Sequence, residues 1–111
     1  MIHRSIFLNI LKSEFPHLKK ELNSQYGVFY DEVNVFHNFA QGLIEIHDEI
    51  KLQLAFELAS NFYNKGNNKM KKAIDVCFVE GLSFRENNWA WKLFPSNLKV
   101  LYKEFHGELK S

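Results

Sequence analysis

Apolar residues recur every three or four positions along most of the chain, which is the period of an amphipathic helix. The clearest case lies in residues 48–84, where two such stripes flank the polar stretch 64–68. The first stripe contains Leu54, Ala55, Leu58, Ala59 and Phe62, and the second contains Met70, Ala73, Ile74, Cys77, Phe78 and Gly81. Gly66, between polar residues, indicates a helix C-cap followed by a short link. Short links make neighbouring helices antiparallel, so the sequence predicts a helical hairpin here.

Similar stripes predict helices on both sides of this hairpin. They are expected over residues 2–14, from Pro16 to about Gly27, from an N-cap at Asp31 to at least Ile44, over residues 89–94, and from Ser96 to about Phe105. The hairpin itself is expected to begin at an N-cap on Asp48 and to fade near Ser83. The short segment 28–30 is rich in β-prone residues, so an extended conformation is expected there. Gly42 either permits close packing within one long helix or breaks that helix.

These elements predict an all-α protein, because no pair of segments has the alternating pattern of paired strands. With 111 residues the chain is expected to form a single domain, residues 1–111. About six helices would pack as a compact stack of antiparallel hairpins, either HEAT-like or armadillo-like, or as an orthogonal bundle. No sequence repeat of fixed period favours the solenoid form.

The composition of the chain indicates the cellular compartment in which the protein is expected. No apolar run approaches the roughly 18 residues that would cross a bilayer, and residues 1–14 lack the pattern of a signal peptide. The single cysteine, Cys77, cannot form an internal disulfide. We therefore expect a cytoplasmic protein with no membrane association.

The sequence offers no catalytic residues and no cofactor site, so we expect a protein that is not an enzyme. Phosphate-binding glycine loops and nucleophile elbows are absent, and the five histidines form no metal-binding spacing. Cys77 and His37 lie on apolar stripes, where packing is the expected role. Lys69, Lys71 and Lys72 form a basic cluster, but the near-neutral chain does not favour direct nucleic-acid binding. A pocket that holds His37 or His47 beside two carboxylates would favour an enzyme.

Charge is distributed unevenly along the chain. Residues 28–64 carry six acidic side chains and one lysine, whereas both flanking segments are net basic. This pattern indicates either helix-dipole complementation and solubility, or an acidic face that binds a basic protein. For the second alternative the candidate contact residues are Asp31, Glu32, Glu45, Asp48, Glu49 and Glu57, with Asn61, Tyr30 and Tyr63 adding hydrogen bonds and aromatic area. We expect these carboxylates to project outward together.

Four segments carry a resemblance to a family of small bacterial helical proteins of unknown function. They are FPHLKKEL at 15–22, FELA at 56–59, VEGLSF at 79–84 and LFPSNLK at 93–99. Small proteins of this kind resemble the immunity partners of bacterial toxin systems, including contact-dependent growth inhibition. The resemblance implies a protein that binds and blocks a toxin domain, often a nuclease, and it implies no catalytic residues.

The leading hypothesis is therefore an immunity-type protein that binds a cognate toxin with a basic surface. Nucleases bind phosphates in basic clefts, and an acidic helical face is complementary to such a cleft. The alternative is a helical protein–protein interaction module with another regulatory or structural role. The sequence does not determine the oligomeric state.

Overall fold

The computed structural model describes residues 1–25, 27–85 and 87–107. Its elements are α1 (Arg4–Glu14), η1 (Pro16–Leu18), α2 (Lys19–Ser24), α3 (Phe29–Glu45), α4 (Glu49–Lys65), α5 (Asn68–Ala73), η2 (Ile74–Val79), α6 (Asn88–Leu93) and α7 (Ser96–His106). η1 is a single 3₁₀ turn that leads into α2, and η2 is a π-helical continuation of α5. The described residues form seven α-helices and no strand, which confirms the predicted all-α class.

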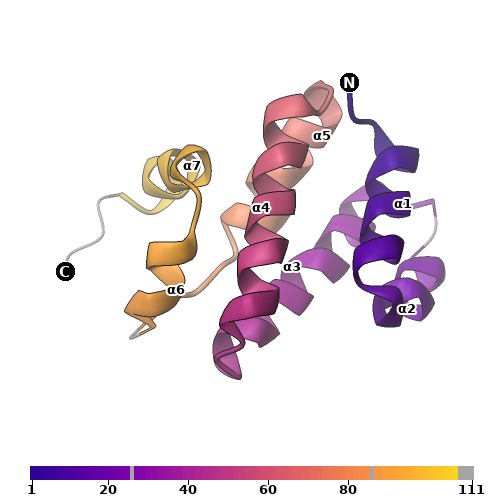
Figure 1. The fold of residues 1–111 in the computed structure, drawn as a ribbon. Helices are drawn as coiled ribbons and strands as arrows, with labels where there is room; N and C mark the ends of the chain where they lie inside the picture. Colours follow the sequence, from indigo (N-terminus) through magenta and orange to yellow (C-terminus); the bar gives the residue numbers. More distant parts are fainter. Residues whose placement is uncertain (26, 86, 108–111) are drawn as a thin grey trace.

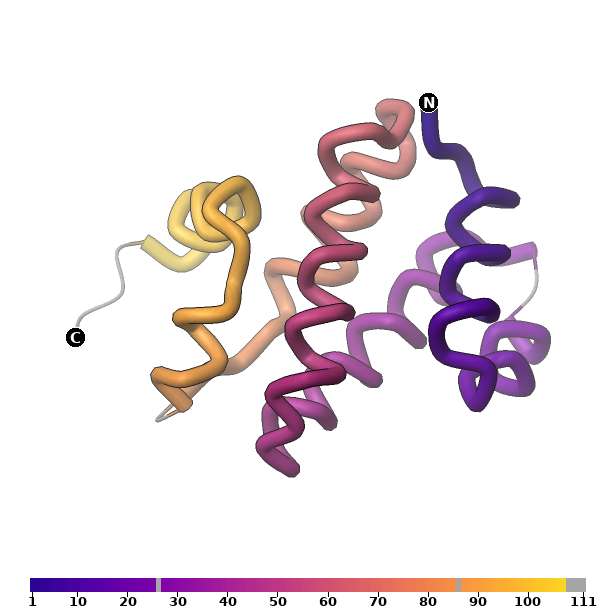
Figure 2. The backbone as a smooth tube through the Cα atoms, viewed as in Figure 1, coloured from indigo at the N-terminus to yellow at the C-terminus, as the bar shows by residue number. Residues whose placement is uncertain are grey.

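The helices are arranged on both sides of α4 (Figures 1 and 2). α1 and α2 lie on one side, α6 and α7 lie on the other, and α3 passes behind α4. The body measures 39 × 29 × 18 Å, and its smallest dimension corresponds to about two packed helices. The N-terminus lies beside the α4–α5 turn, where the Ile2 amide donates to the Lys65 carbonyl (2.7 Å) and the Asn67 amide donates to the Ile2 carbonyl (3.0 Å).

The predicted hairpin is present as α4 and α5, joined by Gly66 and Asn67. Asn67 is the N-cap of α5, since its side-chain oxygen accepts from the Met70 amide at 2.8 Å. Gly66 has extended backbone angles, and its hydrogen faces the Phe62 carbonyl and the Met70 side chain. A side chain at this position would collide with both, so glycine is required by close approach of the two helices.

Several predicted boundaries differ from the structure. α3 begins at Phe29, so only Val28 is extended, and Asp31 lies in the first helical turn instead of at the N-cap. Tertiary packing explains the difference, because the Phe29 ring is buried against Phe7 with centroids 5.7 Å apart. The long form of the third helix is confirmed, since α3 continues through Gly42. The suggestion that Gly42 permits close packing is wrong, because nothing lies within 4 Å of the position a Cβ would occupy.

A partly buried ion pair joins α1 to α3. The Arg4 guanidinium donates two hydrogen bonds to Glu32, from Nε to Oε1 and from Nη2 to Oε2, each 2.7 Å long. The Glu32 side chain is fully buried, and its Oε2 also accepts from the Gly27 amide at 3.4 Å. Two parallel bonds from a planar guanidinium fix both helices in orientation as well as in distance.

Replacing Gly42 by alanine should stabilise the fold. Alanine has the higher helix propensity and the site has room for its methyl group, so we expect a gain of about 1 kcal/mol in the free energy of unfolding. Urea denaturation of the Gly42→Ala variant and the wild type measures this gain in the free energy of unfolding. Gly81→Ala is the contrasting variant, because its Cβ would lie 3.0 Å from the His37 ring, and it should destabilise. A loss of stability in Gly42→Ala would contradict a continuous α3.

Replacing Glu32 by glutamine should lower the free energy of unfolding by about 1–3 kcal/mol, because a buried amide replaces the buried carboxylate that accepts two hydrogen bonds from Arg4. Glu14→Gln, at the exposed end of α1, is the matched control and should change stability by less than about 0.5 kcal/mol. Equal effects from the two variants in urea denaturation would show that the Arg4–Glu32 pair contributes nothing specific.

Candidate protein-binding site

The turn between α3 and α4 has the hydrogen-bond pattern of a Schellman motif. The Asp48 amide donates to the Leu43 carbonyl (3.0 Å) and the His47 amide donates to the Ile44 carbonyl (3.2 Å). His47 occupies the left-handed position, with φ of 58°, where glycine is usual. A side chain there costs on the order of 1 kcal/mol. The turn is therefore held in a conformation that this residue does not itself favour.

Two contacts hold His47 in this conformation. Its ring stacks on the Trp89 ring of α6, with centroids 3.9 Å apart and planes inclined by 13°. Its Nε2 lies 3.0 Å from Oε1 of Glu49. Asp48 completes the turn as the N-cap of α4, since its Oδ1 accepts from the Lys51 amide at 3.1 Å. The predicted N-cap is thereby confirmed, and the three side chains fix where α4 begins.

The turn presents acidic and apolar side chains together around an open hollow of about 600 Å³. We call this surface the acidic corner and define it by Ile46, His47, Asp48, Glu49 and Ile50, which line the hollow, together with Glu45, the residue before them at the end of α3. Ile46 is 71% exposed and Ile50 is 85% exposed, so these two large apolar side chains have no intramolecular partner that covers them. Apolar anchors within a polar rim are typical of protein-binding surfaces.

Helix-dipole complementation accounts for only part of the acidic corner. Glu49 lies in the first turn of α4, where a carboxylate is stabilised by the positive end of the helix. Glu45 lies in the last turn of α3, where the helix end is negative and a carboxylate is unfavourable. The position of Glu45 therefore has no explanation in helix stability.

The remaining predicted contact residues lie elsewhere. Glu57 is two turns along α4 and accepts from the Gln53 amide at 3.4 Å, and Asn61 follows it on the exposed side. Tyr63 is half-buried beneath the Lys71 ammonium, which lies 5.2 Å from its ring centroid. Tyr30 and Asp31 are in the first turn of α3, about 21 Å from Glu45 along the helix axis.

The predicted outward projection of all six carboxylates is therefore wrong in two respects. Glu32 is buried in the ion pair with Arg4, because its position on α3 faces α1. Asp31 is exposed, but the length of α3 separates it from Glu45. Asp48 and Glu49 line the hollow at the α3–α4 turn, whereas Glu45 lines a neighbouring hollow that also contains Arg85. None of the other candidates lines either hollow.

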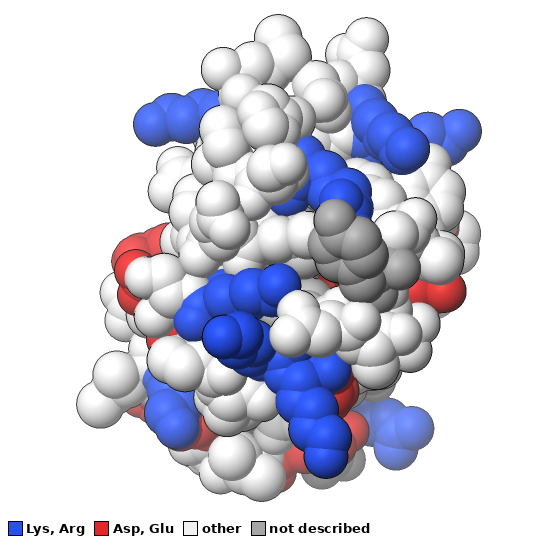
Figure 3. Space-filling view, turned by 90° about the vertical axis from the view of Figure 1, so that its right-hand side faces the viewer, with Lys and Arg blue, Asp and Glu red and all other residues white. Residues whose placement is uncertain are grey.

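Lysines of the chain do not neutralise the acidic corner. Within the described ranges, no lysine side chain forms an ion pair with a carboxylate, and the two ion pairs present are Arg4–Glu32 and His47–Glu49. Figure 3 views the side of the molecule where α1 and α2 lie, and Lys and Arg side chains spread across that face. Lys12, Lys19 and Lys20 belong to those helices. Arg85 lines the same hollow as Glu45, and Glu49 contacts His47, so Asp48 and Glu49 are the carboxylates of the corner that have no lysine or arginine beside them.

A second acidic cluster was missed because its members are distant in sequence. Burial and the nearby Glu80 and Glu104 raise the pKa of Asp75 above its ordinary value of 3.8. Burial, Asp31 and Glu80 likewise raise the pKa of the Cys77 thiol. Asp75 therefore lies near Glu80 and Glu104, and Cys77 lies near Asp31 and Glu80. A raised thiol pKa also disfavours the thiolate that a nucleophilic cysteine needs.

The site geometry gives little support to catalysis. His47 contacts one carboxylate, Glu49, while the Asp48 carboxylate caps α4. The side chains of His47 and Glu49 are 57% and 59% exposed, without the enclosure that a catalytic pair requires. His37 is hydrogen-bonded instead to the main chain, with its Nδ1 3.1 Å from the Phe78 carbonyl oxygen.

In the described ranges no cluster of three or more His, Cys, Asp or Glu could hold a metal ion. No helix in these ranges is long and apolar enough to span a bilayer.

Comparison with known proteins identifies a family but no activity. Residues 8–108 match the family model described as Domain of unknown function (DUF7674). The chain belongs to this family. No curated protein and no solved structure matches it. The matched DUF7674 segment contains the whole acidic corner, and it confirms the expectation of a family of unknown function that covers most of the chain.

The cluster around Asp75 predicts a pH-dependent effect on stability. A carboxyl whose pKa is higher in the folded chain than in the unfolded chain lowers stability when it is ionised, and this loss disappears as the pH falls below the unfolded value. Asp75→Asn should therefore raise the free energy of unfolding at pH 7, and the gain should vanish below pH 3.8.

Urea denaturation across this pH range measures the gain, with Glu14→Gln as a control that should lack it. A gain from Asp75→Asn that persists unchanged in acid would mean that the ionised Asp75 carboxylate, penalised by burial and by Glu80 and Glu104, is not its cause.

Proposed function

We propose that this chain is an immunity-type protein of the bacterial cytoplasm. It binds a cognate toxin domain with a basic surface, in the first instance a nuclease, and blocks it without catalysing a reaction. The contact surface is the acidic corner, which replaces the wider acidic face expected from sequence. Glu57 and Asn61, further along the exposed side of α4, extend this surface.

The exposure of Ile46 and Ile50 among three carboxylates carries the proposal. A protein with no partner gains nothing from leaving two isoleucines 71% and 85% exposed, since burying such a side chain is worth about 1.5–3 kcal/mol. The surrounding carboxylates limit self-association through mutual repulsion and favour a cationic partner. Apolar anchors provide affinity, and the charges provide a fast and selective encounter.

The rigidity and the charge of the site suit a basic surface. The turn is short, and the Schellman motif, the His47–Trp89 stack and the Asp48 cap make it rigid. A rigid turn loses little conformational entropy on binding. Nuclease clefts carry positive charge to hold phosphates, so a carboxylate-bearing corner is complementary to them in sign.

The proposal predicts that the product of the adjacent upstream gene co-purifies with this chain, since an immunity gene normally follows its toxin gene. Glu45→Lys should slow the association of the two proteins about tenfold at low salt and make the rate less dependent on salt. Stopped-flow or surface plasmon resonance measures both.

Glu14→Lys is the matched control, because Glu14 is also an exposed last residue of a helix and the charge change is equal. It should leave the association rate nearly unchanged. Ile46→Ala with Ile50→Ala should mainly raise the dissociation rate, by about 10- to 100-fold. Failure of the upstream protein to bind, or equal effects of the two lysine variants, would overturn the proposed role and favour an interaction module with another partner.

A further inference from the structure

A second surface with exposed apolar side chains lies at the other end of α3, where this helix begins. Val28 is 52% exposed and Tyr30 is 39% exposed, on either side of the buried Phe29 in the sequence. These three residues, with Gly27 and Lys69, line a hollow of about 380 Å³, which we call the Lys69 hollow. Its volume lies in the range of pockets that bind ligands, so it has room for an apolar anchor of a partner.

Lys69 makes this hollow basic. Its ammonium lies 5.9 Å from the centroid of the Phe29 ring, so a cation–π contact holds the charge beside the apolar lining. The Lys69 side chain is exposed, and within the described ranges no lysine forms an ion pair with a carboxylate. The hollow lies at the N-terminal end of α3, where the helix dipole adds positive potential. An occupant that combines an apolar side chain with a carboxylate would therefore be complementary to the Lys69 hollow.

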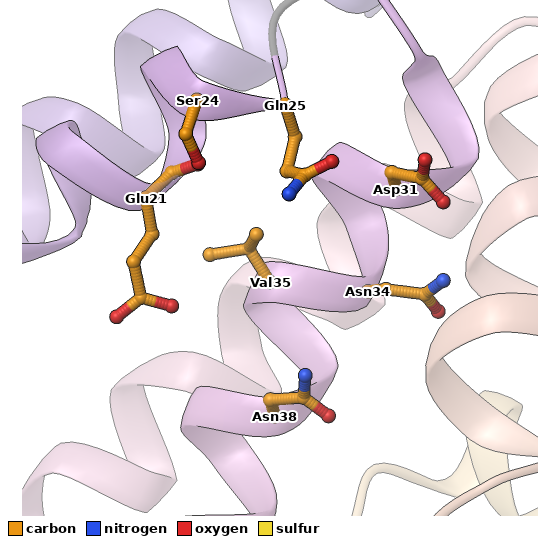
Figure 4. Close-up of a pocket in the computed structure, with 7 residues that line it drawn as sticks. All are labelled: Glu21, Ser24, Gln25, Asp31, Asn34, Val35 and Asn38. Atoms are coloured by element: carbon orange, nitrogen blue, oxygen red, sulfur yellow. The ribbon is translucent and has the colours of Figure 1, made fainter.

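The groove between α2 and α3 has the opposite charge. Figure 4 shows Glu21 and Asp31 on opposite sides of it, and none of the described residues that line it is a lysine or an arginine. The side chains of Asp31, Asn34 and Asn38 point away from α2. An occupant with a carboxylate would be repelled there, in contrast to the Lys69 hollow.

The acidic corner has the combination of groups that the Lys69 hollow lacks. Ile46 and Ile50 are exposed apolar side chains, and Asp48 and Glu49 line the turn with no lysine or arginine among the lining residues. Two corners repel each other because both are negative, whereas a corner and a Lys69 hollow attract. The net charge of the chain is only +1 at pH 7, so repulsion between whole molecules does not oppose such a contact.

The two surfaces cannot meet within one molecule. They lie at opposite ends of α3, a continuous helix of 17 residues that is about 25 Å long. A contact between them therefore joins two copies of the chain, and it is heterologous, because the corner of one copy meets the hollow of the next. One hollow and one corner then remain free at the two ends of the pair, so further copies can add there.

We propose that the acidic corner of one copy of this chain docks in the Lys69 hollow of a second copy. Ile50 enters the hollow between Val28 and Tyr30, and the carboxylates of Asp48 and Glu49 approach the Lys69 ammonium. The contact needs no toxin, and it covers apolar side chains that the single molecule leaves exposed. A bound toxin and a docked copy exclude each other at the corner, and only this competition rests on the proposed function.

Sedimentation equilibrium of the purified chain measures this self-association. The wild type should associate with a dissociation constant below about 1 mM, and added salt should weaken the association because part of the attraction is electrostatic. Val28→Asp should weaken it at least about tenfold, because a carboxylate in the hollow repels the corner. This variant should stay folded, since Val28 is the N-cap of α3 and aspartate is a favoured N-cap. Ile50→Lys, which removes the anchor and adds a cation, should have the same effect.

Mixing these two variants tests the head-to-tail arrangement. The Val28→Asp chain retains its corner and the Ile50→Lys chain retains its hollow, so an equimolar mixture should form a dimer that grows no further. A contact between two corners or between two hollows would instead persist in one variant alone, and that result would overturn the proposal.

Lys69→Glu and Lys19→Glu separate docking in the hollow from a general effect of charge. Both lysines are exposed in the first turn of a six-residue helix, and both substitutions change the charge equally. Only Lys69→Glu should raise the dissociation constant, by about tenfold. Equal effects of the two, a mixture without dimer, or a wild type that stays monomeric up to about 1 mM would each overturn the proposal. Because no toxin is present in these measurements, such results would leave the proposed function standing.

Discussion

The structure depends on a connected series of buried aromatic rings that runs through all its layers. The Phe36 ring lies 6.2 Å from that of Phe7 and 4.7 Å from that of Phe78, which in turn lies 6.4 Å from that of Phe56. The series continues from Phe56 to Phe94 and then to Tyr102 of α7. Each ring buries a large apolar area, and edge-to-face contacts add a preferred geometry. Helices that are short on their own are stabilised by this shared core.

Two sets of polar side-chain interactions, which we call polar ties, position particular segments against that core. Arg4 and Glu32 orient α1 against α3, and the Gln41 carboxamide holds the irregular chain that follows η2. Each tie satisfies groups that would otherwise be buried without partners, and no buried side-chain polar atom lacks a partner among the described residues. α3 takes part in both ties, so it is the reference on which the other elements are positioned.

The candidate binding surface lies at the C-terminal end of α3. The acidic corner there offers apolar anchors beside carboxylates, which suits a folded, basic surface. This selectivity for positive charge agrees with the acidic middle of the sequence.

Local patterns by themselves determined the helical class, the hairpin with its Asp48 cap, and the acidic bias of the middle segment, because these depend on residues within a few positions of one another. Only the tertiary structure decided which acidic residues are available. Glu32 and Asp31 are adjacent in sequence, yet one faces α1 and is buried while the other faces solvent. The exposure of Ile46 and Ile50, the stacking of His47 on Trp89, and the approach of Asp31 to Cys77 all depend on how distant elements pack. Helical periodicity specifies an apolar face, but the partner that covers a given side chain comes from elsewhere in the chain.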